Sequence, residues 1–292
     1  MNSTKKVIAT IGCSGHIAKI FVEGLLQQNL HVRLLARDAQ KAKAQYPTAE
    51  VIEGSMMNPD DVYTALKGAD AAFLVTPMGV RNDKSSEVAA AKPVIAAAQR
   101  VNLKHLIYIS VLQADKPSEL SLIDAKHDIE VLLSQSGVPW TAIRPGSFME
   151  DVFDIRMDQF AKGKFLFPVI KDRRFTYTSQ KDISRFVAQN IEQPLGGGFN
   201  FVAPRTYSIY EVEGLLKSFS GREVTASGRS FFYYTMKFLQ PLLHWKGHKL
   251  STIIPLVDYF NKYGYVDSGF NVEQLAPDFK MTTLEEHLGA LF

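Results

Sequence analysis

The chain is poor in cysteine and in long apolar runs. Cys13 is the single cysteine among 292 residues, which excludes an internal disulfide and a cysteine zinc cluster. No apolar run approaches the ~18 residues of a membrane span. The first residues, MNSTKK, lead directly into the first predicted strand, so we expect no signal peptide. These absences favour a cytoplasmic enzyme or binding protein without a membrane span.

The chain also lacks an excess of one charge sign. It has 33 Lys and Arg against 30 Asp and Glu, a net charge of +3, and no basic block, so nucleic-acid binding is not expected. His244 and His248 have the i, i+4 spacing of metal ligands. Gly247 disfavours a helix between them and no third ligand is nearby, so we predict no metal site.

A glycine turn follows the first apolar run. Residues 7–11 are typical of a buried strand, residues 12–18 read G-x-x-G-x-x-A, and an amphipathic helix is expected over 17–28. In that context the glycines allow a tight turn and close approach of a pyrophosphate to the helix N-terminus. The alternative is a tight turn without a ligand. For Cys13 the sequence favours a packing role over a thiol activated by the helix N-terminus.

The second predicted strand, 31–36, ends at Arg37 and Asp38. An acidic residue here binds the ribose 2′-hydroxyl of NAD, whereas an arginine accommodates the 2′-phosphate of NADP. Because Arg37 comes first, we predict NADP, with NAD still possible. The alternative is that Arg37 is a solvated loop charge.

Strands and helices then alternate. This order predicts an α/β fold with a Rossmann-type doubly wound parallel sheet and ligands at the carboxyl ends of its strands. Pro93 is expected to kink or break its helix. We predict an NAD(P)-binding domain over 1–150 and a smaller α+β substrate-binding portion over 151–292, interleaved with it. The further strands are expected at 51–53, 71–75, 105–110 and 140–144, and the helices at 39–45, 59–66, 85–101 and 121–136.

The second half is less regular and rich in aromatic residues. A helix is expected over 152–161, short strands over 164–167, 174–178 and 199–202, and capping boxes at Ser179, Ser208 and Thr282. For the aromatic stretch 231–265 a membrane-surface helix is disfavoured, because Pro241 and Gly247 interrupt it. Two other interpretations remain. The stretch forms core and a subunit contact, possible in a homodimer, or it forms an apolar lid for a small hydrophobic or aromatic substrate.

Several local motifs together carry a resemblance. The chain resembles the NmrA-like family, an atypical short-chain dehydrogenase/reductase branch that includes NADPH-dependent quinone reductases and non-catalytic redox sensors. The resemblance is good from Lys6 to Asp151 and looser beyond. It rests on the turn at 12–18, Arg37, VIEGSMMNPDD at 51–61, LKGADAAFLVTP at 66–77, HLIYIS at 105–110 and AIRPGSFMED at 142–151.

The resemblance implies a set of cofactor contacts along the strand ends. Ser55 stands where the family has Asp, so its polar contact with the adenine is in question. The implied residues are Gly12, Ser14, Gly15, His16 and Ile17 at the pyrophosphate, Arg37 at the adenosine ribose or its phosphate, Ser55 and Met56 at the adenine, Thr76 and Pro77 at the second ribose, the helix lysine Lys126, and Pro145, Gly146 and Phe148 at the nicotinamide.

The predicted catalytic residues are Lys126 and Ser110. Conventional short-chain dehydrogenases use Tyr-x-x-x-Lys, but Leu122 stands four residues before Lys126. Lys126 then binds the nicotinamide ribose or acts as the acid itself, or is a solvated helix lysine. Ser110 ends a strand at the edge of the sheet where ligands bind, and it is either a site residue or a simple cap of the strand end.

The leading functional hypothesis is an NADPH-dependent oxidoreductase that reduces a quinone or related conjugated carbonyl, since the cofactor carries the hydride chemistry. The alternative is a non-catalytic NAD(P)-binding redox sensor that acts through a protein partner. A nucleotide-sugar epimerase is disfavoured by the missing tyrosine, and no Gly-x-Ser-x-Gly motif supports a hydrolase.

Overall fold

A seven-stranded parallel sheet lies at the centre of the computed structural model, which describes residues 5–13, 16–77, 84–227, 231–240, 250–266 and 269–292. The strand order is β11-β6-β5-β4-β1-β2-β3, the order of a doubly wound Rossmann sheet with one added strand. The predicted fold class is therefore confirmed. The strands are β1 (Lys6–Ile11), β2 (Leu30–Ala36), β3 (Glu50–Glu53), β4 (Ala71–Leu74), β5 (Leu106–Ile109), β6 (Trp140–Pro145) and β11 (Gly197–Phe201).

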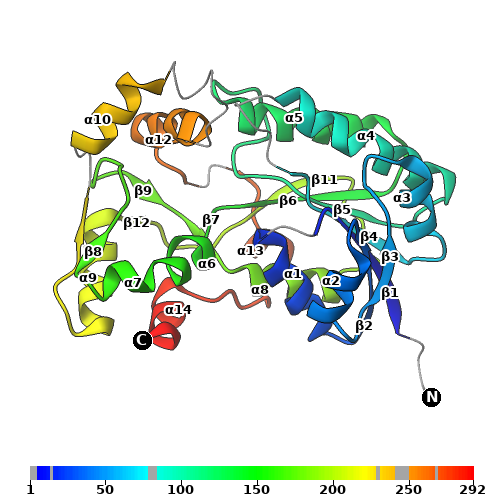
Figure 1. Cartoon of the computed structure of the whole chain (residues 1–292), viewed down its shortest axis with the longest axis horizontal. Helices are drawn as coiled ribbons and strands as arrows, with labels where there is room; N and C mark the ends of the chain where they lie inside the picture. The colour runs from blue at the N-terminus through cyan, green and yellow to red at the C-terminus, as the bar shows by residue number, and fades with distance from the viewer. Residues whose placement is uncertain (1–4, 14–15, 78–83, 228–230, 241–249, 267–268) are drawn as a thin grey trace.

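Helices cover both faces of this sheet (Figure 1). A layer of helices packs on each face, and each layer has its own apolar core. The first layer is α1 (His16–Leu26) and α8 (Gln180–Gln189), the second is α3 (Pro59–Leu66), α4 (Lys84–Arg100) and α5 (Ser121–Gln135), and α2 (Ala39–Gln45) lies beside β2 and β3.

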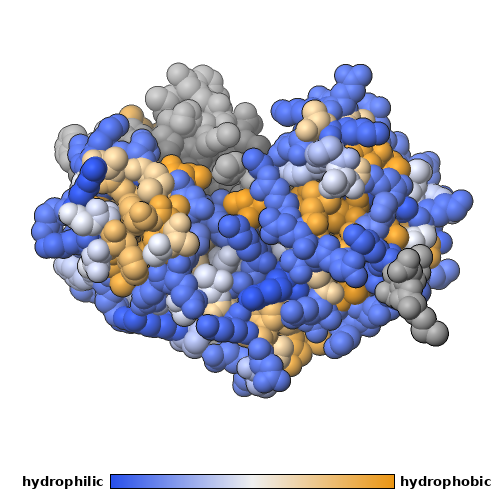
Figure 2. Space-filling view, turned by 90° about the horizontal axis from the view of Figure 1, so that it is seen from below, coloured by the Kyte–Doolittle hydropathy of each residue, from blue (hydrophilic) through white to orange (hydrophobic). Residues whose placement is uncertain are grey.

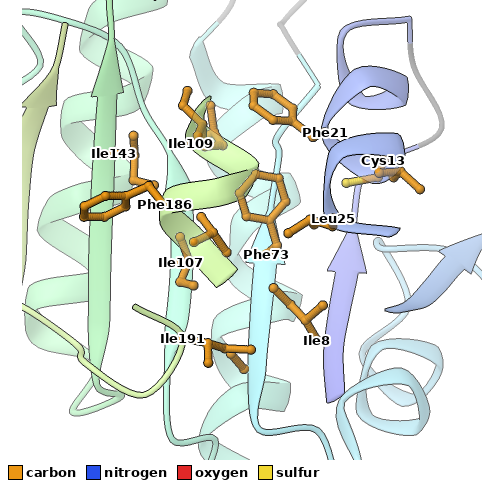
Figure 3. Close-up of a cluster of buried hydrophobic side chains, with 14 of the residues drawn as sticks. Ile8, Cys13, Phe21, Leu25, Phe73, Ile107, Ile109, Ile143, Phe186 and Ile191 are labelled. Carbon is orange, nitrogen blue, oxygen red and sulfur yellow. The ribbon is translucent and has the colours of Figure 1, made fainter. Parts of the chain in front are cut away.

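The alternation of side chains along each strand explains the two cores. Ile8 and Phe73 point toward α1 and α8, whereas Ala9 and Leu74 point toward α3, α4 and α5. In Figure 3 the strand side chains meet Phe21 of α1 and Phe186 of α8. Both strand faces are buried, so the apolar runs in the sequence are nearly continuous.

The second half of the chain enters the first sheet. β11 pairs in parallel with β6, with Phe199 opposite Ile143. The strand predicted near 199–202 therefore exists, but its assignment to the smaller α+β portion is wrong. α8 also packs closely on α1, because a Cβ on Gly24 would lie 2.6 Å from Oγ of Ser184.

Most of the remaining elements of the second half pack around a separate apolar core, whereas Val272 and Leu275 of α13 pack in the core shared with α1 and α8. Three short strand pairs stand beside it: β7 with β10, β9 with β12, and β8 with β13. The elements are β7 (Ser147–Phe148), α6 (Met149–Val152), the 3-10 helix η2 (Asp154–Arg156), α7 (Met157–Phe160), β8 (Lys164–Phe165), β9 (Arg174–Phe175), β10 (Tyr177–Thr178), β12 (Tyr207–Ser208), α9 (Ile209–Ser220), β13 (Thr225–Ala226), α10 (Phe231–Phe238), α12 (Leu250–Tyr263), α13 (Val272–Leu275) and α14 (Leu284–Leu291).

Several local predictions need correction. The helix expected over 152–161 is divided into α6, η2 and α7. The break expected at Pro93 is not found, since α4 runs through that residue as one helix. The capping box at Ser208 is present, but Ser179 makes no side-chain cap bond, and the box expected at Thr282 lies one residue later, at Thr283.

Within the described ranges, no helix is long and apolar enough to cross a bilayer. Viewed from the side of α14, the surface is largely hydrophilic, with apolar residues in separate patches (Figure 2). Among the described residues no group of three potential metal-ligating side chains comes together. His244 and His248 lie outside the described residues.

Candidate active site

The turn after β1 requires glycine at its first position. Gly12 has φ +80°, and a Cβ there would lie 1.9 Å from the carbonyl oxygen of Val75. The turn thus packs directly on the end of β4, where L side chains do not fit. Ser14 and Gly15 lie outside the described residues, and His16 and Ile17 begin α1.

A first hollow, of about 200 Å³, lies between this turn and the end of β3. Ser55 stabilises the loop there, because its backbone N–H donates to Asp61 (2.8 Å) and its Oγ accepts from the N–H of Met57 (3.2 Å). Met56 and Pro77 add apolar wall. The Ser55 side chain serves the turn itself, and the hollow, which Arg37 also lines, has a largely apolar wall that suits a flat ring.

A second, larger hollow of about 400 Å³ lies beside the end of β2, between α1 and α2. Arg37 and Lys41 line it, and within the described part of the chain neither side chain has an acidic partner. A third cation, Lys19, is paired with Glu23 on its own helix at 3.5 Å. Asp38 also lines the hollow, and its carboxylate accepts from the backbone N–H of Lys41 at 2.9 Å as the cap of α2. The hollow thus holds two cations that form no ion pair and one carboxylate that is engaged as a cap, and the two cations can bind an anion.

The wall of this second hollow is otherwise inert. Cys13 and Tyr46 both line it. Burial raises the pKa of the Cys13 thiol to about 12 and that of the Tyr46 hydroxyl to about 12. Cys13 is therefore a packing residue, as the sequence favoured, rather than an activated thiol.

A closed polar network lies beneath the ends of β4 and β5. Nζ of Lys126 is 2.7 Å from Oε1 of Glu87 and 3.0 Å from Oγ1 of Thr76. The Thr76 hydroxyl donates to the same Glu87 oxygen (2.6 Å), and the Tyr108 hydroxyl lies 3.3 Å from Oγ1 of Thr76. Lys126 is buried, so the solvated-helix alternative is wrong.

The pKa of Lys126 is raised in this network. Burial by itself would lower it, but the charge of Glu87 and the proximity of Tyr108 more than offset that effect. Burial likewise raises the pKa of the Tyr108 hydroxyl well above its ordinary value. Both groups therefore stay protonated at neutral pH.

Ser110 belongs to a second buried network, one turn of α5 further on. Its hydroxyl donates to Oε1 of Glu130 at 2.6 Å. Arg144 donates to both oxygens of that carboxylate, at 3.0 Å and 2.6 Å. The hydroxyl hydrogen of Ser110 is thus engaged inside the protein.

The end of β6 lies near the far end of the row formed by the carboxyl ends of the strands. A Cβ on Gly146 would lie 2.6 Å from Oγ1 of Thr176, so this backbone also approaches a neighbour too closely for a side chain. Phe148 makes an edge-on contact with Phe21 of α1, with ring centroids 5.6 Å apart. Pro145 ends the strand and is buried.

A third hollow lies between the loop after β5 and α12, lined by Gln113, Tyr259 and Tyr263 among others. Gln113 has φ +71°, an uncommon conformation for a residue other than glycine, and its Oε1 accepts from the Tyr259 hydroxyl at 2.8 Å. Leu122 packs in the adjoining apolar cluster with Tyr259. Part of the aromatic stretch therefore reaches the strand edge.

Sequence reasoning missed Lys41 beside the end of β2 and, further along the carboxyl ends of the strands, Glu87 and Gln113. Glu87 shares a helical face with Ala90, Ala91 and Val94, all buried. The available signal was an acidic residue in line with apolar residues three, four and seven positions later, on the face of the helix that faces the core. Gln113 had no such signal, because its partner Tyr259 comes from α12, far along the chain.

Comparison with known proteins gives consistent relatives. Over 221 residues the chain is 25% identical to the NAD(P)H azoreductase of Xenophilus azovorans, covering 75% of each chain. It is 25% identical over 228 residues to quinone oxidoreductase 2 of Escherichia coli, covering 75% of this chain and 76% of the relative. It is also 24% identical over 213 residues to the photosystem II assembly factor Ycf39 of Trieres chinensis, covering 69% and 67%.

Solved structures share the fold over nearly the whole chain. The NADPH complex of the E. coli NADPH-dependent quinone oxidoreductase has a TM-score of 0.76 at 21% identity, covering 98% of this chain and 99% of that one. The NADP(H) complex of triphenylmethane reductase from Citrobacter sp. has a TM-score of 0.78 at 16% identity, covering 98% and 100%. Residues 4–288 match the NmrA-like family, and the chain belongs to this family.

Proposed function

We propose that this protein is an NADPH-dependent oxidoreductase that reduces a quinone or a related conjugated carbonyl. The observation that carries the proposal is the basic hollow at the end of β2, where Arg37 and Lys41 have no acidic partner among the described residues. It fits a 2′-phosphate, and the adjoining apolar hollow beside Ser55 and Met56 fits an adenine. The relatives named as NAD(P)H azoreductase and quinone oxidoreductase support the same class.

Each part of the strand edge has a role in this proposal. Residues of the segment 1–150 hold the cofactor, with Gly12 and the N-terminus of α1 at its pyrophosphate and Pro145 to Phe148 at its nicotinamide. The second half supplies α12, whose Tyr259 and Tyr263 form an aromatic wall for a flat acceptor. When bound, NADPH supplies the hydride, and the protein supplies the relative position of cofactor and acceptor.

Steady-state oxidation of NADPH with a panel of quinones, azo compounds and conjugated carbonyls tests this proposal. We expect turnover with at least one flat aromatic acceptor. Tight NADPH binding without turnover on any acceptor would overturn the enzyme assignment.

Cofactor choice is tested by Arg37→Ala and Lys41→Ala. Each variant should weaken NADPH binding about 10-fold or more, because a charge-assisted bond to phosphate is worth roughly 1.5–3 kcal/mol. NADH binding should change little, since it has no 2′-phosphate. Equal losses for both cofactors would contradict a phosphate site at the end of β2.

A non-catalytic redox sensor is the second candidate. Two observations favour it. Lys126 is held in an ion pair with Glu87, and the position of the tyrosine of conventional enzymes is taken by Leu122, which packs in an apolar cluster. A sensor should bind NADP+ at least as tightly as NADPH and retain a protein partner when purified. A reductase needs neither property, so comparing the affinities for NADP+ and NADPH separates the two candidates.

A further inference from the structure

Glu87 is buried in a place where a carboxylate is costly. It lies in the first turn of α4, with 1% of its surface exposed. A buried carboxylate persists when a cation and hydrogen-bond donors compensate it. Lys126 and the Thr76 hydroxyl do so here, both at the same oxygen of Glu87.

The ammonium group of Lys126 has three N–H donors, and the structure gives it three acceptors. Two are Glu87 and Thr76, and the third is the carbonyl oxygen of Ile109 at 3.2 Å. The hydroxyl hydrogen of Thr76 is itself given to Glu87. Neither side chain has a hydrogen left for a cofactor ribose or for an acceptor oxygen.

We propose that Glu87 is a positioning residue that holds Lys126 as a permanent ammonium ion, so that Lys126 does not donate a proton during reduction. The proposal rests on the function proposed above. Lys126 instead fixes the ends of β4 and β5 through its bonds to Thr76 and Ile109.

The chemistry balances without a protein acid. The acceptor gains a hydride, with its two electrons, from the nicotinamide of NADPH, which becomes NADP+. The reduced acceptor is then an oxyanion, and its second hydrogen is a proton from water. A quinone suits this scheme because its hydroquinone anion is stabilised by conjugation.

The charged and titratable groups around Lys126 make the proposal testable. Glu87 faces it from α4, and the ring of Tyr108 faces it from β5, with Nζ 5.2 Å from the ring centroid. On α5 itself, Glu130 lies one turn away but is held by Arg144 and Ser110. Removing the charge of Glu87 therefore leaves Lys126 without a carboxylate partner and lowers its pKa.

The first experiment compares Glu87→Gln with Glu130→Gln by urea unfolding between pH 7 and 10. In Glu87→Gln the folded-state pKa of Lys126 falls below the unfolded value, so stability should rise with pH across this range. Glu130→Gln is the matched control. It also loses a buried carboxylate, but its partner Arg144 does not titrate there, and no such slope is expected.

The second experiment measures turnover of the double variant Glu87→Gln/Lys126→Met, which replaces the ion pair by a neutral pair, with two acceptors whose reduced anions differ in basicity. If Lys126 only fixes the strand ends, the variant should lose the same factor in turnover with both acceptors. A loss about 10-fold or more larger with the acceptor that gives the more basic anion would overturn the proposal, because a general acid contributes more where the oxyanion is more basic.

A flat pH profile in Glu87→Gln would also overturn the proposal, since Glu87 would then not control the charge of Lys126. If the unchanged protein binds NADPH but reduces no acceptor, the proposed function fails. The unfolding slopes still decide in that case whether Glu87 holds the lysine charged.

Discussion

At the scale of single residues, the two networks under the strand edge differ in the cation they use. Glu87 is paired with a lysine and Glu130 with an arginine. Both carboxylates lie on the inner faces of helices and both engage a hydroxyl at a strand end. The lysine pair can change its charge state when its environment changes, whereas the arginine pair remains ionised.

Gly12→Ala should destabilise the protein strongly. The new Cβ would meet the carbonyl oxygen of Val75 at 1.9 Å in a left-handed backbone. We expect a loss of about 3 kcal/mol or more in the free energy of unfolding and loss of NADPH binding. Gly68→Ala is the control, with φ +73° but open space around it, and should cost about 1–2 kcal/mol. Equal costs would contradict the close approach.

His105 should make stability depend on pH. Burial lowers its pKa, and its two ring nitrogens lie 2.9 Å from Ile191 O and 2.9 Å from Thr141 Oγ1. Because the carbonyl can only accept, Nδ1 carries the proton and the neutral ring fits. The unfolded chain binds a proton more readily, so this contribution is present above about pH 6.5 and is lost as the pH falls.

His105→Gln removes the titrating group and keeps a donor and an acceptor. The difference in unfolding free energy between the two proteins should change as pH falls from 7 to 5, measured by urea titration. A constant difference over that range would show that His105 is not held neutral.

At the scale of elements, the N-terminus of α8 is capped by a buried carboxylate from another segment. Glu150 accepts from the Ser179 hydroxyl at 2.8 Å and from the N–H of Gln180 at 3.1 Å. This explains why the predicted box at Ser179 does not form, since its hydroxyl is a donor to Glu150 instead of an acceptor at the helix N-terminus. A remote side chain has replaced the local cap.

Glu150→Ala should cost about 2–3 kcal/mol in urea unfolding, because it leaves buried donors unpaired. Ser208→Ala removes the local capping box of α9 and should cost about 1 kcal/mol. A Ser208→Ala loss equal to or larger than that of Glu150→Ala would argue against the remote cap.

At the scale of the whole molecule, the two halves of the chain share the central sheet and the apolar core that α1 and α8 cover. β11 extends the sheet beyond β6, and α8 covers β1, β4 and β5 together with α1. We expect residues 1–150 alone to lack cooperative thermal unfolding and to bind a hydrophobic dye, because α8 no longer covers that face. A sharp unfolding transition of this segment, measured by circular dichroism, would contradict the prediction.

The elements of the first half could be read from the sequence because their signals are local. Asn58 and Pro59 mark the start of α3 as predicted, and Gly137, at φ +72°, follows the end of α5. The strands predicted over 164–167 and 174–178 are present as β8, β9 and β10, but β12 and β13 were not predicted, since two residues carry too little pattern. The positions of β12 and β13 depend on partners far along the chain, β9 and β8.

The sequence by itself determined the parallel sheet, the glycine turn and the arginine after β2, because apolar periodicity and backbone needs act over a few residues. Only the tertiary structure decided what surrounds Lys126. Its partners come from α4, β4 and β5, and the charge state of a buried lysine depends on such remote groups. The same holds for β11 and the cap of α8, since pairing between distant segments leaves no local pattern.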